Sequence, residues 1–310
     1  MILLGRYILR ICRDINLESL FEQFNDIDNK YIVSDYNEII VDFSKCRYIS
    51  PSALTVLVSY LVNKIYTSHF LDISVKPNSD IDQYISRMDF YNILGIDNYE
   101  NFNRYNEAGR FITIKNITAI NYDLVDEIMA ILVNNDCISK SLYYTIDWSF
   151  NELLDNVFEH SQSHIGGFLI AQSYKDHVEF CVVDNGIGIP GSLKQNAIYA
   201  NLNNIECLIK STEKQVTVGS GQGNGLYITR RFVERNLGEM HIYSNNGHLY
   251  IGEGNCYAYE LDNKWDGTII TLKVNKNIDI DIYDVFDTNK KYSLPSRYLD
   301  EIDNEDFLLW

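Results

Sequence analysis

The sequence predicts an α+β fold, with helices on one face of a mixed or antiparallel sheet, preceded by a smaller α/β domain. Three observations support this prediction. Short strand-like and helix-like segments alternate over the first hundred residues, which is typical of an α/β layer. Two helical segments, 122–133 and 139–161, come next. Beyond residue 165 apolar and polar residues alternate with a period of two, which indicates strands joined by short turns.

The first domain is expected to contain three strands and three helices. Pro51 suits the first turn of a helix, where its missing N–H group would have no partner in any case. Gly95 suits the position after a helix, because glycine adopts the left-handed conformation that often ends one. In chain order the expected elements are an N-terminal strand, a helix over 17–24, a strand over 38–43, a helix from 51, a strand over 71–75 and a helix over 81–94.

A polar stretch over 97–109, with little apolar periodicity, separates the first domain from the second. We therefore expect domains at 1–105 and 106–275, followed by an acidic C-terminal extension at 276–310. The second domain should open with a strand over 111–117 and the two helices given above. After them we expect strands over 168–174 and 177–184, a glycine-containing loop, a helix over 224–237 and strands over 239–244, 248–252, 256–261 and 268–274.

Composition limits the classes of function. The 310 residues include 46% hydrophobic and 22% charged side chains, which is typical of a folded globular protein. A formal net charge of −17 makes nucleic acid an unexpected partner, because the surface would repel a polyphosphate. The six cysteines form no Cys-x-x-Cys pair, which predicts reduced thiols in a cytoplasmic protein. Arg6 and Arg10 interrupt the N-terminal apolar stretch, so we expect a strand there, and no apolar run is long enough for a membrane span.

Three polar residues share one face of the helix predicted at 139–161. Glu152, Asn156 and His160 are spaced by four, and each step of four rotates by only about 40° around an α-helix. A carboxylate, an amide and an imidazole in a row can serve a cation and a nucleophile. The alternative is a solvated helix face, which is common in amphipathic helices.

A second motif begins at Asp184, directly after a predicted strand, and continues with Gly186 and Gly188. A carboxylate at a strand end can accept a hydrogen bond from an adenine amino group, and glycines allow the backbone to approach a flat ring. The alternative is an ordinary loop. Together with Gly191 these glycines also satisfy the dinucleotide pattern Gly-x-Gly-x-x-Gly, but Pro190 and the residues after it make a poor helix opening for such a site.

A third motif places four glycines within seven positions, immediately before the helix predicted at 224–237. Four glycines so close together cost much chain entropy on folding. We therefore expect them where a function requires backbone without side chains. Free N–H groups at the start of a helix can hold phosphates. No Gly-Lys-Ser/Thr follows, which excludes a Walker A loop, and the alternative is a flexible hinge. The residues are Gly219, Gly221, Gly223 and Gly225, followed by Leu226.

The order of these motifs, E-x-x-x-N on a helix, D-x-G-x-G after a strand and G-x-G-x-G-L before a helix, resembles the GHKL ATPase superfamily. Gly267 and Thr268, before the final strand, complete the pattern. Members include DNA gyrase B, histidine kinases and anti-sigma-factor serine kinases. The resemblance covers residues 110–274 and implies a Bergerat-type α/β sandwich that binds ATP with Mg²⁺. The stretch from Glu152 to His160 is most similar to the anti-sigma kinases, which also carry a histidine four residues after the asparagine.

The resemblance implies a role for each motif. Glu152 would be the general base, Asn156 would ligate Mg²⁺ and Asp184 would bind the adenine. The segment 191–220 would form a lid over the nucleotide. The other residues implied to contact the nucleotide are His160, Gly186, Gly188, Gly219, Gly221, Gly223, Gly225, Leu226 and Thr268.

A second resemblance covers part of the first domain. The segment 41–61, VDFSKCRYISPSALTVLVSYL, resembles the strand, loop and helix of a STAS domain, the fold of anti-sigma-factor antagonists. In that family the partner kinase phosphorylates a serine at the helix start, and Ser52 occupies the matching position. Ser50 stands where the family usually has aspartate, and Ala53 where glycine is common. The alternative for Ser52 is an ordinary first-turn helix residue.

Two functions are compatible with these motifs. In the first, the protein is a regulatory serine/threonine kinase or slow ATPase that acts on a STAS-like target, its own first domain included. In the second, ATP orders the lid and so switches the binding of a protein partner, without turnover. The sequence is compatible with a monomer and with a homodimer, and neither nucleic acid nor a membrane is expected as a partner.

Overall fold

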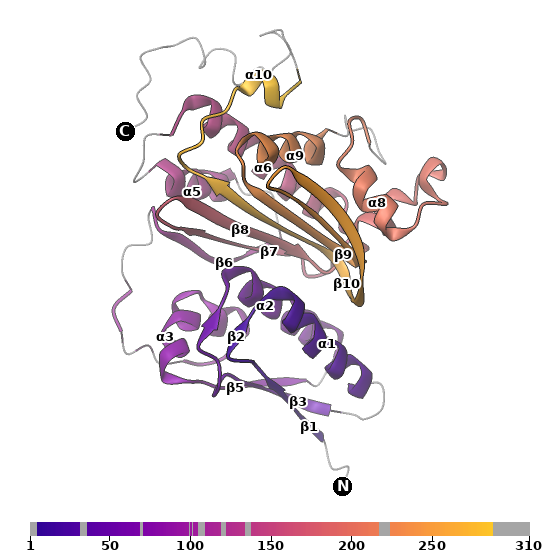
Figure 1. Cartoon of the computed structure of the whole chain (residues 1–310). Helices are drawn as coiled ribbons and strands as arrows, with labels where there is room; N and C mark the ends of the chain where they lie inside the picture. Colours follow the sequence, from indigo (N-terminus) through magenta and orange to yellow (C-terminus); the bar gives the residue numbers. More distant parts are fainter. Residues whose placement is uncertain are drawn as a thin grey trace.

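The structure of the chain is a computed structural model that describes residues 5–31, 36–68, 71–98, 100, 102–104, 109–118, 122–133, 138–216 and 224–287. Helices and sheets alternate in layers (Figure 1). On one side of a five-stranded sheet lie the helices α5 (Tyr122–Val133), α6 (Lys140–Glu159) and α9 (Gly225–Arg235). On its other side lie α1 (Leu17–Tyr31) and α2 (Pro51–Thr67), and a three-stranded sheet lies beyond them.

The three-stranded sheet belongs to the N-terminal part of the chain and confirms the three expected strands. It is parallel, in the order β1 (Gly5–Arg10), β3 (Tyr36–Asp42) and β5 (Asp72–Lys76). A short parallel pair, β2 (Asp14–Ile15) with β4 (Tyr48–Ile49), leads into α2. Helix α2 begins at Pro51 as predicted, because the Ser50 hydroxyl accepts a hydrogen bond from the Ala53 N–H at 3.1 Å.

Two helix predictions in this part were imprecise. The helix expected over 81–94 is divided into α3 (Ser79–Arg87) and α4 (Phe90–Ile93), because Asp89 adopts a left-handed conformation with a φ of 63°. Gly95 ends the second piece with a φ of 68°, as expected. Helix α1 continues to Tyr31, well past the predicted end at residue 24, since its last residues are polar and give no apolar signal.

The five-stranded sheet is antiparallel in all of its described pairings, so of the two predicted alternatives, mixed or antiparallel, the structure has the second. Two of its four neighbouring pairs, β7 with β8 and β9 with β10, are joined by short turns, and a parallel pair would need a long crossover. In spatial order the strands are β6 (Phe111–Ile117), β7 (Gly167–Ser173), β8 (His177–Asp184), β10 (Asn255–Asn275) and β9 (Glu239–Gly252).

Both faces of this sheet are buried. Side chains alternate along β8, so Val182 packs with α5, α6 and α9, while Val183 packs with the N-terminal part of the chain. Strand β7 alternates likewise, with Leu169 toward the three helices and Phe168 toward α1 and α2. The domain's own helices therefore cover one face, as predicted, and the N-terminal part covers the other with a continuous core.

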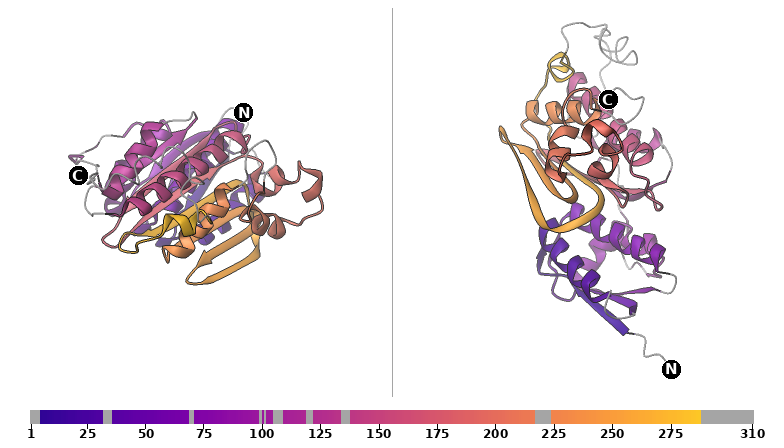
Figure 2. Two further views of the ribbon diagram at one scale, coloured as in Figure 1. Left: turned by 90° about the horizontal axis from the view of Figure 1, so that it is seen from above. Right: turned by 90° about the vertical axis from the view of Figure 1, so that its right-hand side faces the viewer.

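Strand β9 turns back on itself at Asn245, which has a φ of 50°. An extended strand would hold residues seven apart at a distance of about 23 Å. The His241 Nδ1 and His248 Nε2 atoms are instead 3.0 Å apart, so the predicted Asn-Asn-Gly turn is present. Figure 2 shows β9 and β10 curling out at one edge of the sheet.

The segment expected to be a lid contains helices that the sequence did not indicate. They are α7 (Gly188–Leu193) and α8 (Asn204–Ser211), with a 3₁₀ turn, η1 (Ala197–Tyr199), between them. Pro190 lies in the first turn of α7, where proline is tolerated, so a helix of six residues does begin here. Helix α8 packs on β9 through fully buried Leu208.

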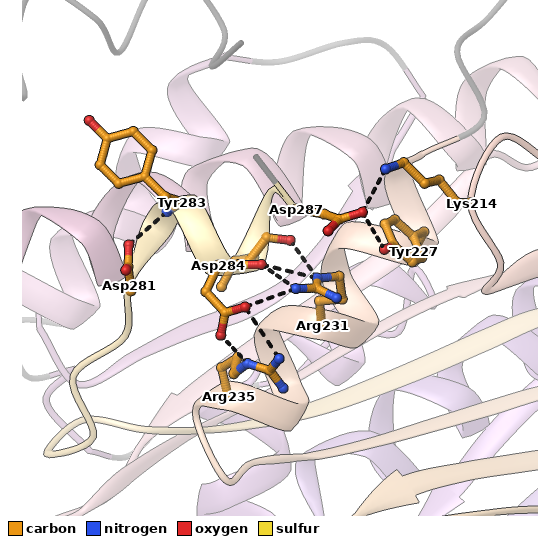
Figure 3. A network of polar contacts seen from close by, with 9 residues as sticks. Lys214, Tyr227, Arg231, Arg235, Asp281, Tyr283, Asp284 and Asp287 are labelled. Carbon is orange, nitrogen blue, oxygen red and sulfur yellow. Dashed lines mark hydrogen bonds and ion pairs between the residues drawn. The ribbon is translucent and has the colours of Figure 1, made fainter. Parts of the chain in front are cut away.

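The described part of the C-terminal extension folds onto α9. Helix α10 (Ile282–Val285) buries both of its terminal residues, and Asp284 lies between two arginines of α9 (Figure 3). Arg231 Nη2 is 3.0 Å from Asp284 Oδ1, and Arg235 pairs with the other carboxylate oxygen. None of the helices in the described ranges combines the length and the hydropathy needed to cross a bilayer.

Candidate functional site

Helix α6 presents the first motif along one edge of its buried stripe. Phe150 and Leu153 are buried against the sheet and fix the rotation of the helix. Glu152 and Asn156 are therefore held at the border of the core, where both are partly buried. His160 is the residue that ends the helix, and its N–H donates to the Asn156 carbonyl at 3.1 Å. The structure thus places all three residues on one line, as their spacing predicted.

Asp184 is the last residue of β8, and its side chain points to the same face of the sheet as Val182. The residue is 5% exposed. Its Oδ1 accepts a hydrogen bond from the Gly186 N–H at 2.8 Å. Burial raises the pKa of the Asp184 carboxyl to about 7, although hydrogen bonds from Gly186 and Thr268 act in the opposite direction. A carboxyl with this environment is a strong candidate for reading a ligand.

The loop after Asp184 follows the neighbouring backbone so closely that side chains are excluded. A Cβ on Gly186 would lie 1.8 Å from the Ser161 carbonyl oxygen, and one on Gly188 would lie 2.4 Å from Ser244 Oγ. Gly188 also has a φ of 69°, which favours glycine. The Ser244 hydroxyl donates to the Gly267 carbonyl at 2.6 Å and accepts from the Ile189 N–H at 3.0 Å. The glycines are thus needed to hold this loop against its neighbours.

The start of α9 meets Glu152. A Cβ on Gly225 would lie 2.2 Å from Glu152 Oε2, so any other residue would displace the carboxylate. The N-terminus of a helix carries a partial positive charge, which favours a carboxylate at this point. Leu226 is half-buried beside it and packs on the apolar core under α6. The first and third motifs are therefore in contact through Gly225.

Other predicted residues are distributed differently. Thr268 pairs with Asp184 across β10 and β8, so the late Gly-Thr lies beside the second motif. Ser52 lies in the first turn of α2, on the opposite side of the five-stranded sheet from Glu152, and the structure does not bring it to the site. Its hydroxyl is 3.0 Å from that of Ser50. Gly219, Gly221 and Gly223 lie outside the described residues.

Sequence reasoning missed two residues that hold the site together. The Trp265 indole N–H donates to the Asp184 carbonyl at 2.8 Å, and Trp265 is 4% exposed. Ser244 links the loop at Ile189 to Gly267, as described above. A tryptophan two residues before a Gly-Thr pair was the available signal for the first of them. Ser244 gave none, since it is one of many strand serines.

The described residues fit an adenine nucleotide. Asp184 provides a buried acceptor for an amino group, and the tight glycine turn after it holds that carboxyl in place. The N-terminus of α9 provides N–H groups and a helix dipole for phosphate. A Mg²⁺ ion needs only one or two protein oxygens when phosphates and waters complete its shell, and the Asn156 amide suits that requirement.

Residues 147–277 match the family model described as histidine kinase-, DNA gyrase B-, and HSP90-like ATPase. The matched range begins within α6 and ends just after β10, so it contains all three motifs. No curated protein matches the chain. The second part of the chain therefore contains a GHKL-type ATPase domain, which supports ATP binding.

Proposed function

We propose that the chain binds ATP with Mg²⁺ at the site formed by α6, the loop after β8 and the start of α9. The observation that carries this proposal is the buried Asp184 carboxyl at the end of β8, next to glycines that cannot carry a side chain. Asp184 accepts a hydrogen bond from the adenine amino group. Gly186 and Gly188 lie along the base, and Thr268 supports the carboxyl through its own hydrogen bond.

Glu152 acts as the general base in this proposal. Its carboxylate is held at the N-terminus of α9 by the absence of a side chain at Gly225. A base in this position takes a proton from water or from a protein hydroxyl as the oxygen attacks the terminal phosphorus of ATP. The bond from that phosphorus to the bridging oxygen breaks, and ADP leaves. Asn156, one turn further along α6, would hold Mg²⁺ through its amide oxygen, and the bound metal would supply charge neutralisation for the phosphates. The remaining glycines of the third motif, which are not among the described residues, would contact the phosphates.

The reaction we propose is slow phosphoryl transfer, either to water or to a serine or threonine of a STAS-like partner protein. Support for this class comes from the carboxylate at position 152 and from the likeness of the α6 motif to anti-sigma kinases. Transfer within one chain to Ser52 is not part of the proposal, because the five-stranded sheet lies between Ser52 and Glu152. A STAS-like first domain remains a proposal that rests on segment 41–61.

A second candidate is an ATP-dependent binding switch. This candidate is supported by contacts that link the segment after α10 to the expected lid and to the start of α9. Asp287, after α10, accepts hydrogen bonds from Lys214 Nζ at 2.6 Å and from the Tyr227 hydroxyl at 3.3 Å (Figure 3). Lys214 belongs to the expected lid and Tyr227 to the first turn of α9. Nucleotide that moves either group would change the packing of the C-terminal segment.

The test is to measure ATP affinity and Mg²⁺-dependent phosphate release for the wild type, Glu152→Gln and Asn156→Ala. We expect Glu152→Gln to bind ATP but to lose turnover by about 10²- to 10⁴-fold. We expect Asn156→Ala to lose the Mg²⁺-dependent part of the affinity. Glu159→Gln, an exposed glutamate at the end of the same helix, is the matched control.

The outcomes separate the two candidates. Wild-type turnover that depends on Glu152 supports the enzyme. Nucleotide binding without turnover supports the switch. Full turnover in Glu152→Gln would show that the base has been misassigned, and unchanged Mg²⁺ dependence in Asn156→Ala would do the same for the metal ligand.

A further inference from the structure

Helix α2 carries a buried serine whose hydroxyl leaves its own helix. Ser59 is fully buried, and its hydroxyl donates to the Asn185 side-chain oxygen. Two other buried helical hydroxyls bond back to their own helix. Thr55 donates to the Pro51 carbonyl at 2.9 Å, and Thr145 donates to the Ser141 carbonyl at 2.8 Å. Ser59 is therefore used for a contact between the N-terminal part of the chain and the loop after β8.

The alternation of β8 explains why Asn185 is available to α2. Val182 and Asp184 point toward α6, whereas Val183 points toward the N-terminal part. Asn185 is the next residue on that second side, where helix α2 crosses β7 and β8. Two neighbouring residues thus face opposite layers: Asp184 faces the pocket and Asn185 faces α2. Because Asn185 directly follows Asp184, a restraint on the Asn185 side chain also restricts the backbone that carries the Asp184 carboxyl.

A second contact from the same side reaches Asp184 itself. The Trp265 indole N–H donates to the Asp184 carbonyl at 2.8 Å. The other side of the indole meets α1, since the Phe21 and Phe24 rings have their centroids 6.2 and 6.3 Å from it. Phe24 in turn stacks on Tyr60 of α2 at 3.9 Å. The aromatic residues of α1 and α2 therefore fix the indole that holds the Asp184 backbone.

We propose that Ser59 and Trp265 are positioning residues for base recognition, and that the N-terminal part of the chain sets the geometry of the adenine-reading loop through them. This inference rests on the proposed function of Asp184. Asp184 discriminates between bases by orientation, because adenine presents an amino donor at the position where guanine presents a carbonyl oxygen. A loop held by these two contacts keeps the carboxyl aimed at that position, and a loosened loop accepts either base more equally.

The variant that tests this is Ser59→Ala, with Thr55→Val as the matched control. Both remove one fully buried hydroxyl from α2, but only Ser59 reaches Asn185. The measurement is isothermal titration of ATP and of GTP, each with Mg²⁺, into the full chain. We expect the ratio of ATP affinity to GTP affinity to fall by about three- to tenfold in Ser59→Ala and to stay at the wild-type value in Thr55→Val.

Base discrimination separates positioning from simple loss of stability. A variant that is only less stable binds with a smaller active fraction, which lowers the stoichiometry but leaves the ratio unchanged. Trp265→Phe keeps an aromatic ring and removes the indole N–H, so we expect its ratio to fall as well. An unchanged ratio in Ser59→Ala and in Trp265→Phe would overturn the proposal, even with tight ATP binding in the wild type.

A ligand-free measurement keeps the proposal testable if the wild type binds neither nucleotide, which would refute the proposed function by itself. Amide hydrogen exchange of residues 184–189 should be faster in Ser59→Ala than in the wild type and unchanged in Thr55→Val. Equal exchange in all three proteins would mean that α2 does not restrain the loop, and the inference would then be wrong.

Discussion

The two faces of the five-stranded sheet are buried by different kinds of side chain. Toward α1 and α2 the sheet presents Phe168, Ile170 and Val183, which continue the apolar core of the N-terminal part. Toward α6 and α9 it presents Leu169 and Val182, but this face ends in the buried carboxyl of Asp184. The face toward α1 and α2 is covered mainly by apolar side chains, whereas the face toward α6 and α9 ends in a carboxyl group.

The difference shows how one strand can serve stability and recognition together. A buried carboxyl is costly unless it is hydrogen-bonded. Here the opposite face of the same sheet is covered mainly by apolar side chains. Packing against α1 and α2 therefore fixes strand β8 on one face, and the Asp184 carboxyl on the other face can bind a ligand. This account predicts effects of different size on the two faces.

We expect the largest effect on stability from a substitution on the face toward α1 and α2. Phe168→Ala removes a fully buried ring from the shared core, which should lower the free energy of unfolding by about 3–5 kcal/mol. Because the core is continuous, the whole chain should still unfold in a single transition, measured by denaturant titration with circular dichroism. Leu169→Ala, the neighbour on the other face, is the control. Two separate transitions, of which only one responds to Phe168→Ala, would contradict the shared core.

Asp184 should give the polar face a distinctive pH dependence. Its pKa is raised from 3.8 to about 7 in the folded chain, so the folded state binds more protons than the unfolded state between these values. The free energy of unfolding should therefore fall as pH rises from about 4 to about 7, by an amount on the order of 1–4 kcal/mol. Asp184→Asn should remove this slope. Identical pH profiles for the two proteins, measured by urea denaturation, would count against a buried, ionising Asp184.

At Gly225 we expect a smaller effect, seen in activity more than in stability. Gly225→Ala places a Cβ where Glu152 Oε2 now lies, so the carboxylate must rotate away. Phosphate release should fall by about tenfold or more, while unfolding changes little because alanine favours the helix. In a Glu152→Ala background the same change should have no further effect, since the two residues act as a unit. If the losses in phosphate release add up in the double variant, Gly225 and Glu152 act independently and this prediction is wrong.

The smallest effect is expected far from the sheet. Asp287→Asn breaks an exposed ion pair with Lys214, whose partners are both about half accessible. Pairs between exposed groups contribute little to stability and weaken with salt. The expected loss in unfolding free energy is therefore small at low salt and absent at high salt. Asp266→Asn, which breaks the exposed pair with Lys264, is the matched control. A loss well above that of the control would show that the C-terminal segment contributes more than surface charge.

Much of the fold could be predicted from local patterns. Apolar periodicity predicted helix α5 with the same first and last residues as in the structure. Turn residues predicted the strand meander after residue 238. The period of two expected beyond residue 165 was wrong for the start of β7, where Phe168 and Ile170 alternate with other apolar residues. The packing of α1 and α2 on the five-stranded sheet therefore could not be predicted. Parallel or antiparallel pairing was also undetermined locally.

For the site, spacing predicted what shares one element. Glu152, Asn156 and His160 lie on one line because four-residue steps are fixed by helix geometry. Contacts between elements depend on how helices and strands are packed, so Gly225 against Glu152 and Trp265 against Asp184 emerged only from the structure. Ser59 is the clearest case, since it lies 126 residues before its partner.

The central claim is that Asp184 reads the base of a bound adenine nucleotide. The most direct test is isothermal titration of ATP into the wild type and Asp184→Asn at pH 8, with and without Mg²⁺. Asp176→Asn, an exposed aspartate on the turn before β8, is the control. The account predicts Mg²⁺-strengthened binding in the wild type and the control, and an affinity lower by at least about tenfold in Asp184→Asn. Equal affinity in all three proteins, or no binding in the wild type, would contradict it.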